Sequence, residues 1–338
     1  MSNGASQEML AYLESLGADL SDLPENPYEL GGLAIDLILA REPDLTMYEV
    51  AAAAGVDFDL VEALYRTLGV TTDPGARAFT SGDVDLIHTL IESVDGPLAD
   101  DEGEQILRVA ARALTSIAEA AVAEVRQGVE ARHESVDDGI RQSAALGELV
   151  TPLSAGLGVA FRHHLREAIV RQRAGQVGVA ERELMRVAIG FIDLVGFTGL
   201  TAHLPIARMV ELVNSLERRS AEVAQEHDVR VVKIIGDEVM FVGLEPKSTC
   251  AFALDLVAAF DGDEVIPRGS VVYGEVLFRH GDYYGPLVNQ ASRMADLAVP
   301  GEILVDTALA QSAGVGAQPA GRRALRGFDE PVEVFALG

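Results

Sequence analysis

The chain has 338 residues and is strongly acidic, with 26 Lys and Arg against 53 Asp and Glu and a formal net charge of −27 at pH 7. Its length predicts two domains, and its charge argues against nucleic acid or an anionic membrane surface as a partner. One cysteine excludes a disulfide framework, and with no signal peptide and no apolar run of about 18 residues we expect a cytoplasmic protein without a membrane span.

The first half of the chain is rich in Ala, Leu and Glu at helical spacing. We therefore expect an acidic, all-helical domain over residues 1–150. Thr46–Glu49 fits a capping box that would start a helix, and Asp59–Glu62 fits one more loosely. Residues 151–184 are expected to form a helical linker, and the glycines within them leave open whether it is one helix or several.

A helix-turn-helix pattern occupies residues 45–69, with its turn at Gly55, and Phe79–Asp83 resembles the continuation found in MerR-type regulators. The expected recognition helix, however, carries three acidic residues against Arg66 alone. Phosphates would repel that helix, so a packing role within a helical bundle is favoured over DNA binding.

The second half contains runs of β-branched residues that are typical of strands. The expected order is strand 186–193, helix 204–227, hairpin 229–244, helix 248–261, strands 267–280 turning near Gly274, helix 286–297 and strand 302–305, followed by a last hairpin. This order predicts a ferredoxin-like βαββαβ domain over residues 185–338, and the whole chain is predicted to be of α+β class with an all-α domain first.

Two carboxylates are expected to meet at one edge of this sheet. Asp193 ends the first strand and Asp237 lies at the hairpin turn, and the first strand should run parallel to the strand that enters that hairpin. Hard cations such as Mg²⁺ are often held by one or two carboxylates plus substrate phosphates, and the backbone N–H groups of 195–198 could receive a phosphate. The alternative is that both aspartates simply end their strands.

Three segments carry a resemblance to a known family: FIDLVGFTGLT at 191–201, KIIGDEVMFVG at 233–243 and GDYYGPLVNQASRM at 281–294. In order and separation they resemble the catalytic domain of class III nucleotidyl cyclases, over roughly residues 185–338. The resemblance implies a homodimer whose two active sites are shared between subunits. It also implies conversion of ATP into cyclic AMP and pyrophosphate.

The resemblance further implies a role for each matching residue. Asp193, Asp237 and Leu194 would bind two Mg²⁺ or Mn²⁺ ions; Lys233 and Asp282 would read the base; Asn289 and Arg293 would act on the ribose and the reacting phosphate from the other subunit; and Phe197, Thr198 and Arg326 would bind substrate. The chemistry agrees, because adenine presents an acceptor beside a donor, which a Lys and an Asp complement. No side-chain base is expected, since positioning and electrostatics dominate phosphoryl chemistry.

The layout also resembles actinobacterial cyclases in which an N-terminal helical domain inhibits the catalytic domain and releases it at acidic pH. His163 and His164 lie among arginines in the linker, and their protonation could strengthen contacts to acidic helices. The alternative is that two exposed histidines titrate without consequence. A second hypothesis for the whole chain is a non-catalytic, nucleotide-binding or transcription-linked module with a degenerate cyclase domain. Any ligand of the N-terminal domain stays unidentified.

Overall fold

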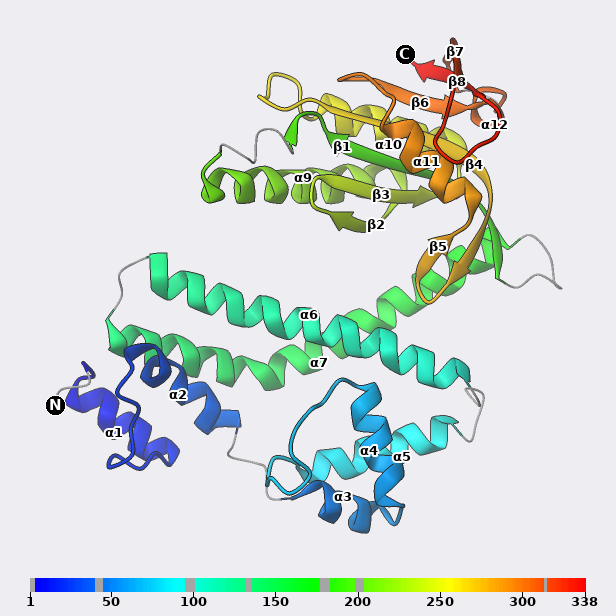
Figure 1. Cartoon of the computed structure of the whole chain (residues 1–338). Coiled ribbons are helices and arrows are strands. Elements are labelled where there is room, and N and C mark those ends of the chain that lie inside the picture. The colour runs from blue at the N-terminus through cyan, green and yellow to red at the C-terminus, as the bar shows by residue number, and fades with distance from the viewer. Residues whose placement is uncertain are drawn as a thin grey trace. The chain divides into compact units, whose positions relative to one another are not determined.

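The computed structural model describes residues 4–39, 45–94, 101–131, 135–176, 183–197, 204–312 and 315–338. The chain divides into two compact units, Met1–His163 and His164–Gly338 (Figure 1). The described helices of the first unit are α1 (Gln7–Leu16), α2 (Pro27–Leu39), α3 (Met47–Ala54), α4 (Phe58–Thr67), α5 (Ser81–Val94), α6 (Asp101–Ala131) and the start of α7 (Val136–Gly175). The predicted domain boundaries at residues 150 and 184 stay predictions, because the division falls inside α7.

Two separate clusters of buried side chains hold the helical unit together. One joins α1, α2 and the start of α7, and the other joins α3, α4 and α5 around Val50, Val61 and Ile87. The capping box at Thr46 is confirmed, since the Thr46 hydroxyl accepts from the Glu49 N–H while the Glu49 carboxylate accepts from the Thr46 N–H. The looser one at Asp59–Glu62 is wrong, because α4 begins at Phe58 after Asp57 and Asp59 already lies in its first turn.

Helix α7 runs for 40 residues across the boundary between the two units and contains Pro152. The segments Val136–Val150 and Pro152–Gly175 are bent by 45° relative to each other. A proline inside a helix removes one backbone hydrogen bond and clashes with the preceding turn, which accounts for the bend. Within the described ranges no single helix has the length and apolarity to cross a membrane, and these two bent segments meet that criterion only when taken together.

An eight-stranded sheet forms the second unit, in the order β2-β3-β1-β4-β6-β8-β7, with β5 paired to β4. Its strands are β1 (Leu184–Leu194), β2 (Arg230–Ile235), β3 (Glu238–Gly243), β4 (Pro267–Arg279), β5 (Asp282–Tyr284), β6 (Ile303–Asp306), β7 (Ala317–Arg323) and β8 (Val332–Leu337). Its helices are α9 (Ile206–His227), α10 (Pro246–Ala258), α11 (Pro286–Ala295) and α12 (Thr307–Ala310). The sequence β1-α9-β2-β3-α10-β4 confirms the predicted α+β class and ferredoxin-like order.

One predicted turn is wrong. Strand β4 continues through Gly274, and the chain turns instead at His280 and Gly281, whose φ angles are 56° and 80°. Gly274 pairs with Val187 of β1, and a Cβ at this position would lie 3.3 Å from Leu287 of α11. The glycine therefore allows α11 to pack closely on the sheet. From the sequence alone, a glycine with this role cannot be told apart from a glycine in a turn.

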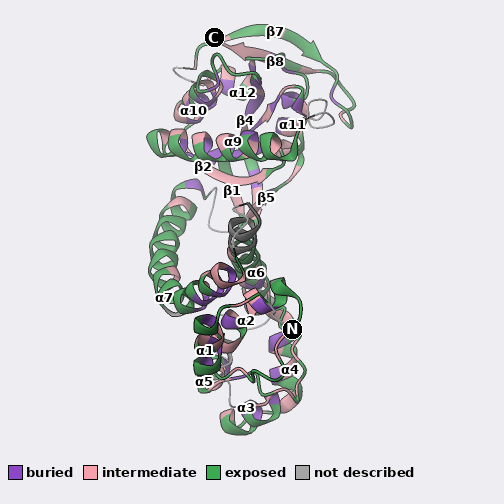
Figure 2. Cartoon of the chain, turned by 90° about the vertical axis from the view of Figure 1, so that its left-hand side faces the viewer, coloured by how far each residue is buried: buried purple, intermediate pink, exposed green. Residues whose placement is uncertain are grey.

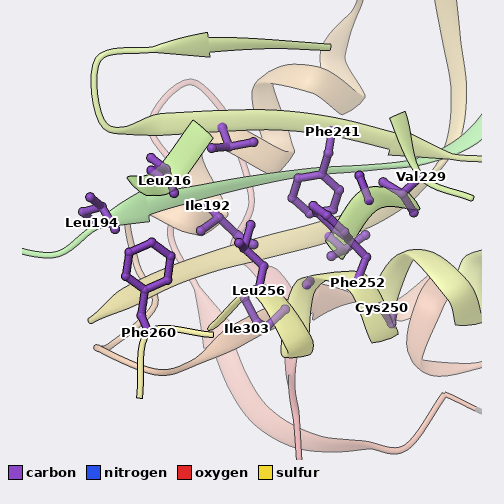
Figure 3. Close-up of a cluster of buried hydrophobic side chains, with 14 of the residues drawn as sticks. Ile192, Leu194, Leu216, Val229, Phe241, Cys250, Phe252, Leu256, Phe260 and Ile303 are labelled. Atoms are coloured by element: carbon purple, nitrogen blue, oxygen red, sulfur yellow. The ribbon is translucent and has the colours of Figure 1, made fainter. Parts of the chain in front are cut away.

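The two faces of the sheet are covered by different helices (Figure 1). Helices α9 and α10 pack on one face, where Ile192, Phe241 and Phe252 belong to the larger buried cluster (Figure 3). Helix α11 packs on the other face, against Phe191, Met240 and their neighbours. We call this second surface the α11 face. Figure 2 shows how strongly burial is concentrated between the sheet and its helices.

Glycine is required at the centre of β1, where a Cβ on Gly190 would lie 2.3 Å from Cζ of Phe241 and 2.5 Å from the Ser270 carbonyl oxygen. The absence of a side chain lets the Phe241 ring lie against the strand and places Phe241 in the core cluster.

Candidate active site

The two residues expected to read a base are in contact although they lie 49 positions apart. Nζ of Lys233, on β2, donates to Oδ2 of Asp282, on β5, at 2.5 Å. Oδ1 of Asp282 also accepts from the backbone N–H of Tyr283 at 2.9 Å, which fixes the carboxylate plane. The side chains are 39% and 27% exposed, so a ligand can reach both of them.

A β-bulge decides which face of the sheet carries Lys233. Val231 pairs with Phe241, whereas Lys233 pairs with Met240, so the register shifts between these two residues. Val231 and Phe241 belong to the face of α9 and α10, and Met240 belongs to the α11 face. Lys233 lies two positions after Val231, so in a regular strand without a bulge the two side chains would share one face. The bulge therefore moves the lysine to the α11 face.

Three carboxylates gather where β1 ends and the β2–β3 hairpin turns. Asp193 pairs with Glu238 in the β1–β3 register, and Asp237 occupies the adjoining turn. Burial and then the charge of Asp193 raise the pKa of Asp237, although its own backbone N–H opposes this. Burial and then the charges of Asp193, Asp296 and Asp237 raise the pKa of Glu238 to about 7. The three carboxylates therefore disfavour one another's ionised forms.

Arg268 at the start of β4 offsets part of this charge. Its Nε lies 3.0 Å from Oδ1 of Asp193 and its Nη2 lies 3.2 Å from Oδ2. Its Nη1 donates to the carbonyl oxygens of Asp296 and Ala298, at 2.8 Å and 3.0 Å, just beyond α11. The two side chains of the ion pair are only 23% and 21% exposed.

The carboxylates could bind a divalent cation whose remaining ligands come from a substrate. Within the described ranges, no group of three or more His, Cys, Asp or Glu side chains has the arrangement to hold a metal ion alone. Asp193 and Asp237 nevertheless repel each other's charge at a half-buried position, which a cation would relieve. Two carboxylates with phosphate oxygens and water are the usual ligands of Mg²⁺.

The segment after β1 agrees only in part with its predicted role. The N–H of Val195 already donates to the carbonyl of Ile266, so it is not free for a phosphate, as the sequence had suggested. This pairing points the Leu194 carbonyl away from β4, towards the side of β3 and Asp237. The side chains of Leu194 and Phe197 are buried in the core, so only their backbone can touch a ligand. Thr198 lies outside the described residues.

Asn289 and Arg293 lie on α11. In the described part of the chain, neither side chain has a hydrogen bond or ion pair with Asp193, Asp237 or the Lys233–Asp282 pair. The Arg293 guanidinium lies over the ring of Phe328 and against Gly327. A Cβ on Gly327 would lie 3.0 Å from Nη1 of Arg293, and its φ is 79°.

Arg326 precedes this glycine and is exposed, so the turn brings a second cation to the neighbourhood of Arg293. Sequence reasoning had named both arginines without predicting this proximity.

His163 and His164 lie on α7, in a stretch whose side chains are exposed (Figure 2). The Nδ1 atom of His164 is 3.8 Å from Glu167, one turn further along. The division between the two units falls between these histidines.

Two residues of the site were missed by sequence reasoning, Arg268 and Glu238. Both follow from register, since β4 and β3 flank β1 and present these residues opposite Asp193. Glu238 directly follows Asp237 and was visible in the motif. Arg268 was hidden because the residue types do not specify the register of β4 against β1.

Comparison with known proteins places this site in a family. Residues 179–337 match the adenylate and guanylate cyclase catalytic domain. An adenylate cyclase of Streptomyces coelicolor is 32% identical over 298 residues, which cover 87% of this chain and 77% of that protein. The chain belongs to the class III cyclase family. The cyclase also shares 28% identity over 305 residues with a pH-sensitive adenylate cyclase of Mycobacterium tuberculosis, covering 86% and 77% of the two chains.

Among solved structures, the adenylyl cyclase CyaB of P. aeruginosa is 21% identical and covers 46% of the cyclase and 96% of its own chain, with a TM-score of 0.40. Both alignments with named adenylate cyclases are longer than the catalytic domain, so the similarity extends into the helical half of the cyclase.

Proposed function

We propose that this cyclase converts ATP into 3′,5′-cyclic AMP and pyrophosphate. The observation that carries the proposal is the contact between Lys233 and Asp282, held on the same face of the sheet as the Asp193 carboxylate. Adenine offers an acceptor at N1 beside a donor at N6, so the lysine can donate to the first and the aspartate can accept from the second. Guanine presents the opposite order at these atoms and would leave both groups unpaired. Such a mismatch can favour ATP over GTP by several orders of magnitude.

The carboxylates of Asp193 and Asp237, with the Leu194 carbonyl, would hold two Mg²⁺ or Mn²⁺ ions. When bound, these ions lower the pKa of the ribose 3′-hydroxyl and neutralise the triphosphate. The 3′-oxygen attacks the α-phosphorus, the bond from that phosphorus to the bridging oxygen breaks, and pyrophosphate leaves while the hydroxyl proton passes to water. Arg293 suits the growing charge on the reacting phosphate, and Arg326 suits the departing pyrophosphate.

We further propose a homodimer with shared sites. Asn289 and Arg293 have no hydrogen bond or ion pair with the carboxylates of their own chain within the described ranges, although all belong to the same unit. A second copy would supply the missing residues to each site. Mixing an Asp193→Asn variant with an Arg293→Ala variant should restore activity, because one of the two sites in the mixed dimer then has both sets of residues.

The test of the activity is formation of cyclic nucleotide from ATP or GTP, measured chromatographically with Mn²⁺. We expect cyclic AMP from ATP, little product from GTP and a loss of at least about 100-fold in Asp193→Asn, because the variant would lose the carboxylate charge that holds the cations at the reacting phosphates. Asp255→Asn is the matched control, since Asp255 lies on α10 and pairs with His227 at the end of α9, away from the α11 face. If the unmodified chain makes no cyclic nucleotide at any pH between about 5.5 and 8, the proposed activity is contradicted and the non-catalytic hypothesis is favoured.

The helical half of the chain is proposed to restrain the catalytic half and to respond to pH. Support comes from the exposed histidines at the boundary between the units and from the similarity to a pH-sensitive relative. Protonation of His163 and His164 would add charge to α7 beside Arg162 and Arg166, in a chain with a large excess of acidic groups. An unchanged pH profile in a double His163→Ala, His164→Ala variant would contradict this mechanism.

A further inference from the structure

Arg268 connects the candidate metal carboxylate to the end of α11. Among the described residues it is the one basic side chain within ion-pair distance of Asp193. Two of its nitrogens contact the two oxygens of that carboxylate, and the third donates to the carbonyl oxygens of Asp296 and Ala298. All three nitrogens of one rigid, planar group are therefore in use.

This geometry fixes the orientation of Asp193. A carboxylate on the last residue but one of a strand would otherwise rotate about its side-chain torsions, whereas paired contacts from a guanidinium define its plane. Each carboxylate oxygen has a second lone pair, so contact with Arg268 leaves room for a cation. The carbonyl contacts hold the residues that follow α11 against the same group.

The charge of Arg268 also acts on the cation itself. A cation bound to Asp193 at about 2 Å would lie roughly 5–6 Å from the guanidinium. Repulsion of a divalent ion at about 6 Å weakens binding about tenfold even at the dielectric constant of water, and more where the site is half-buried. A triphosphate brings several negative charges and overcomes this repulsion, so a cation that arrives with its nucleotide is favoured over the free ion.

We propose that Arg268 is a positioning residue that orients Asp193 and anchors the end of α11, and that its charge makes the site select the cation–nucleotide complex over the free cation. The inference rests on the metal role proposed above for Asp193. It assigns a task to a residue that contacts neither the nucleotide nor the reacting atoms.

Free Mn²⁺ binding to the full chain, measured by electron paramagnetic resonance without nucleotide, tests this assignment. Glutamine keeps polar contacts but removes the charge, so Arg268→Gln should bind Mn²⁺ at the Asp193-dependent site at least about tenfold more tightly. Its turnover of ATP should fall at least about tenfold, because the Asp193 carboxylate is less well oriented. Lysine keeps the charge but cannot make all the contacts, so Arg268→Lys should lose turnover with Mn²⁺ affinity within about twofold of the unmodified chain. A purely structural role would lower affinity and turnover together.

Two controls make the result specific in so acidic a protein. Arg186→Gln removes the same charge at the other end of β1, where Arg186 pairs with Glu275, and should leave Mn²⁺ affinity unchanged. In the double variant Arg268→Gln, Asp193→Asn the gain in affinity should disappear. Unchanged or weaker Mn²⁺ binding in Arg268→Gln overturns the inference, even if the unmodified chain makes cyclic AMP. An active Asp193→Asn variant would instead contradict the proposed metal site.

Discussion

The pKa of Glu238 reports its burial and the negative charge that surrounds it at the candidate active site. Its pKa of about 7, against an ordinary 4.5, means that the folded protein holds a proton that the unfolded chain releases. The contribution of this group to stability is therefore present below pH 4.5 and is lost as the pH rises to about 7. At 1.36 kcal/mol per pKa unit the full loss is about 3 kcal/mol, of which about a quarter is reached by pH 5 and nearly all by pH 8.

Glu238→Gln should remove this dependence, since glutamine is neutral at every pH. The stability gap between the variant and the unmodified chain should widen by about 2–3 kcal/mol from pH 5 to pH 8. For a unit of this size that is roughly 5–10 °C in the calorimetric transition of the catalytic unit, recorded in EDTA. Adding Mn²⁺ should narrow the gap, because a cation stabilises the ionised carboxylate. A gap that is equal at the two pH values would refute the reasoning.

Three further predictions test the fold on which the site is built. Gly190→Ala should destabilise the catalytic unit by about 3 kcal/mol, because its Cβ would meet the Phe241 ring and the β4 backbone, and its calorimetric transition should fall accordingly. Burial raises the pKa of the Cys250 thiol to about 12, so a thiol reagent at pH 8 should react with it only after denaturation, and rapid reaction in the native protein would contradict its placement in the core. Thr46→Ala should lower the stability of the helical unit by about 1 kcal/mol, and an unchanged melting temperature would show that this cap contributes nothing.

Sequence reasoning succeeded where a motif coincides with the end of a regular element. Asp193 and Asp237 were predicted to meet because the order of strands and helices dictates that the end of β1 lies beside the hairpin turn, and the register agrees. The contact between Lys233 and Asp282 was expected from the resemblance, and the sheet brings them together across β2 and β5.

Features that depend on a change of register were not predictable. The shift between Val231 and Lys233 leaves no mark in a run of β-branched residues, because each of them suits either face of the sheet. The place of Arg268 opposite Asp193 depended on the register of β4 against β1, which the sequence does not specify. The hydrogen bond of Val195 to Ile266 depended on how far the pairing of β1 and β4 extends, which the residue types do not encode.

The extra residue in β2 has a consequence for how insertions and deletions act on this cyclase. Deleting Val232 would place Lys233 directly after Val231 and opposite Met240, so the alternation of a regular strand would keep the lysine on the α11 face. Straightening the strand with every residue kept would instead turn Lys233 towards Phe241 and Phe252 on the opposite side of the sheet, where an ammonium group is costly to bury. A relative that lacks one residue before this lysine could therefore keep it in the site, whereas a relative that keeps the residue but loses the bulge could not.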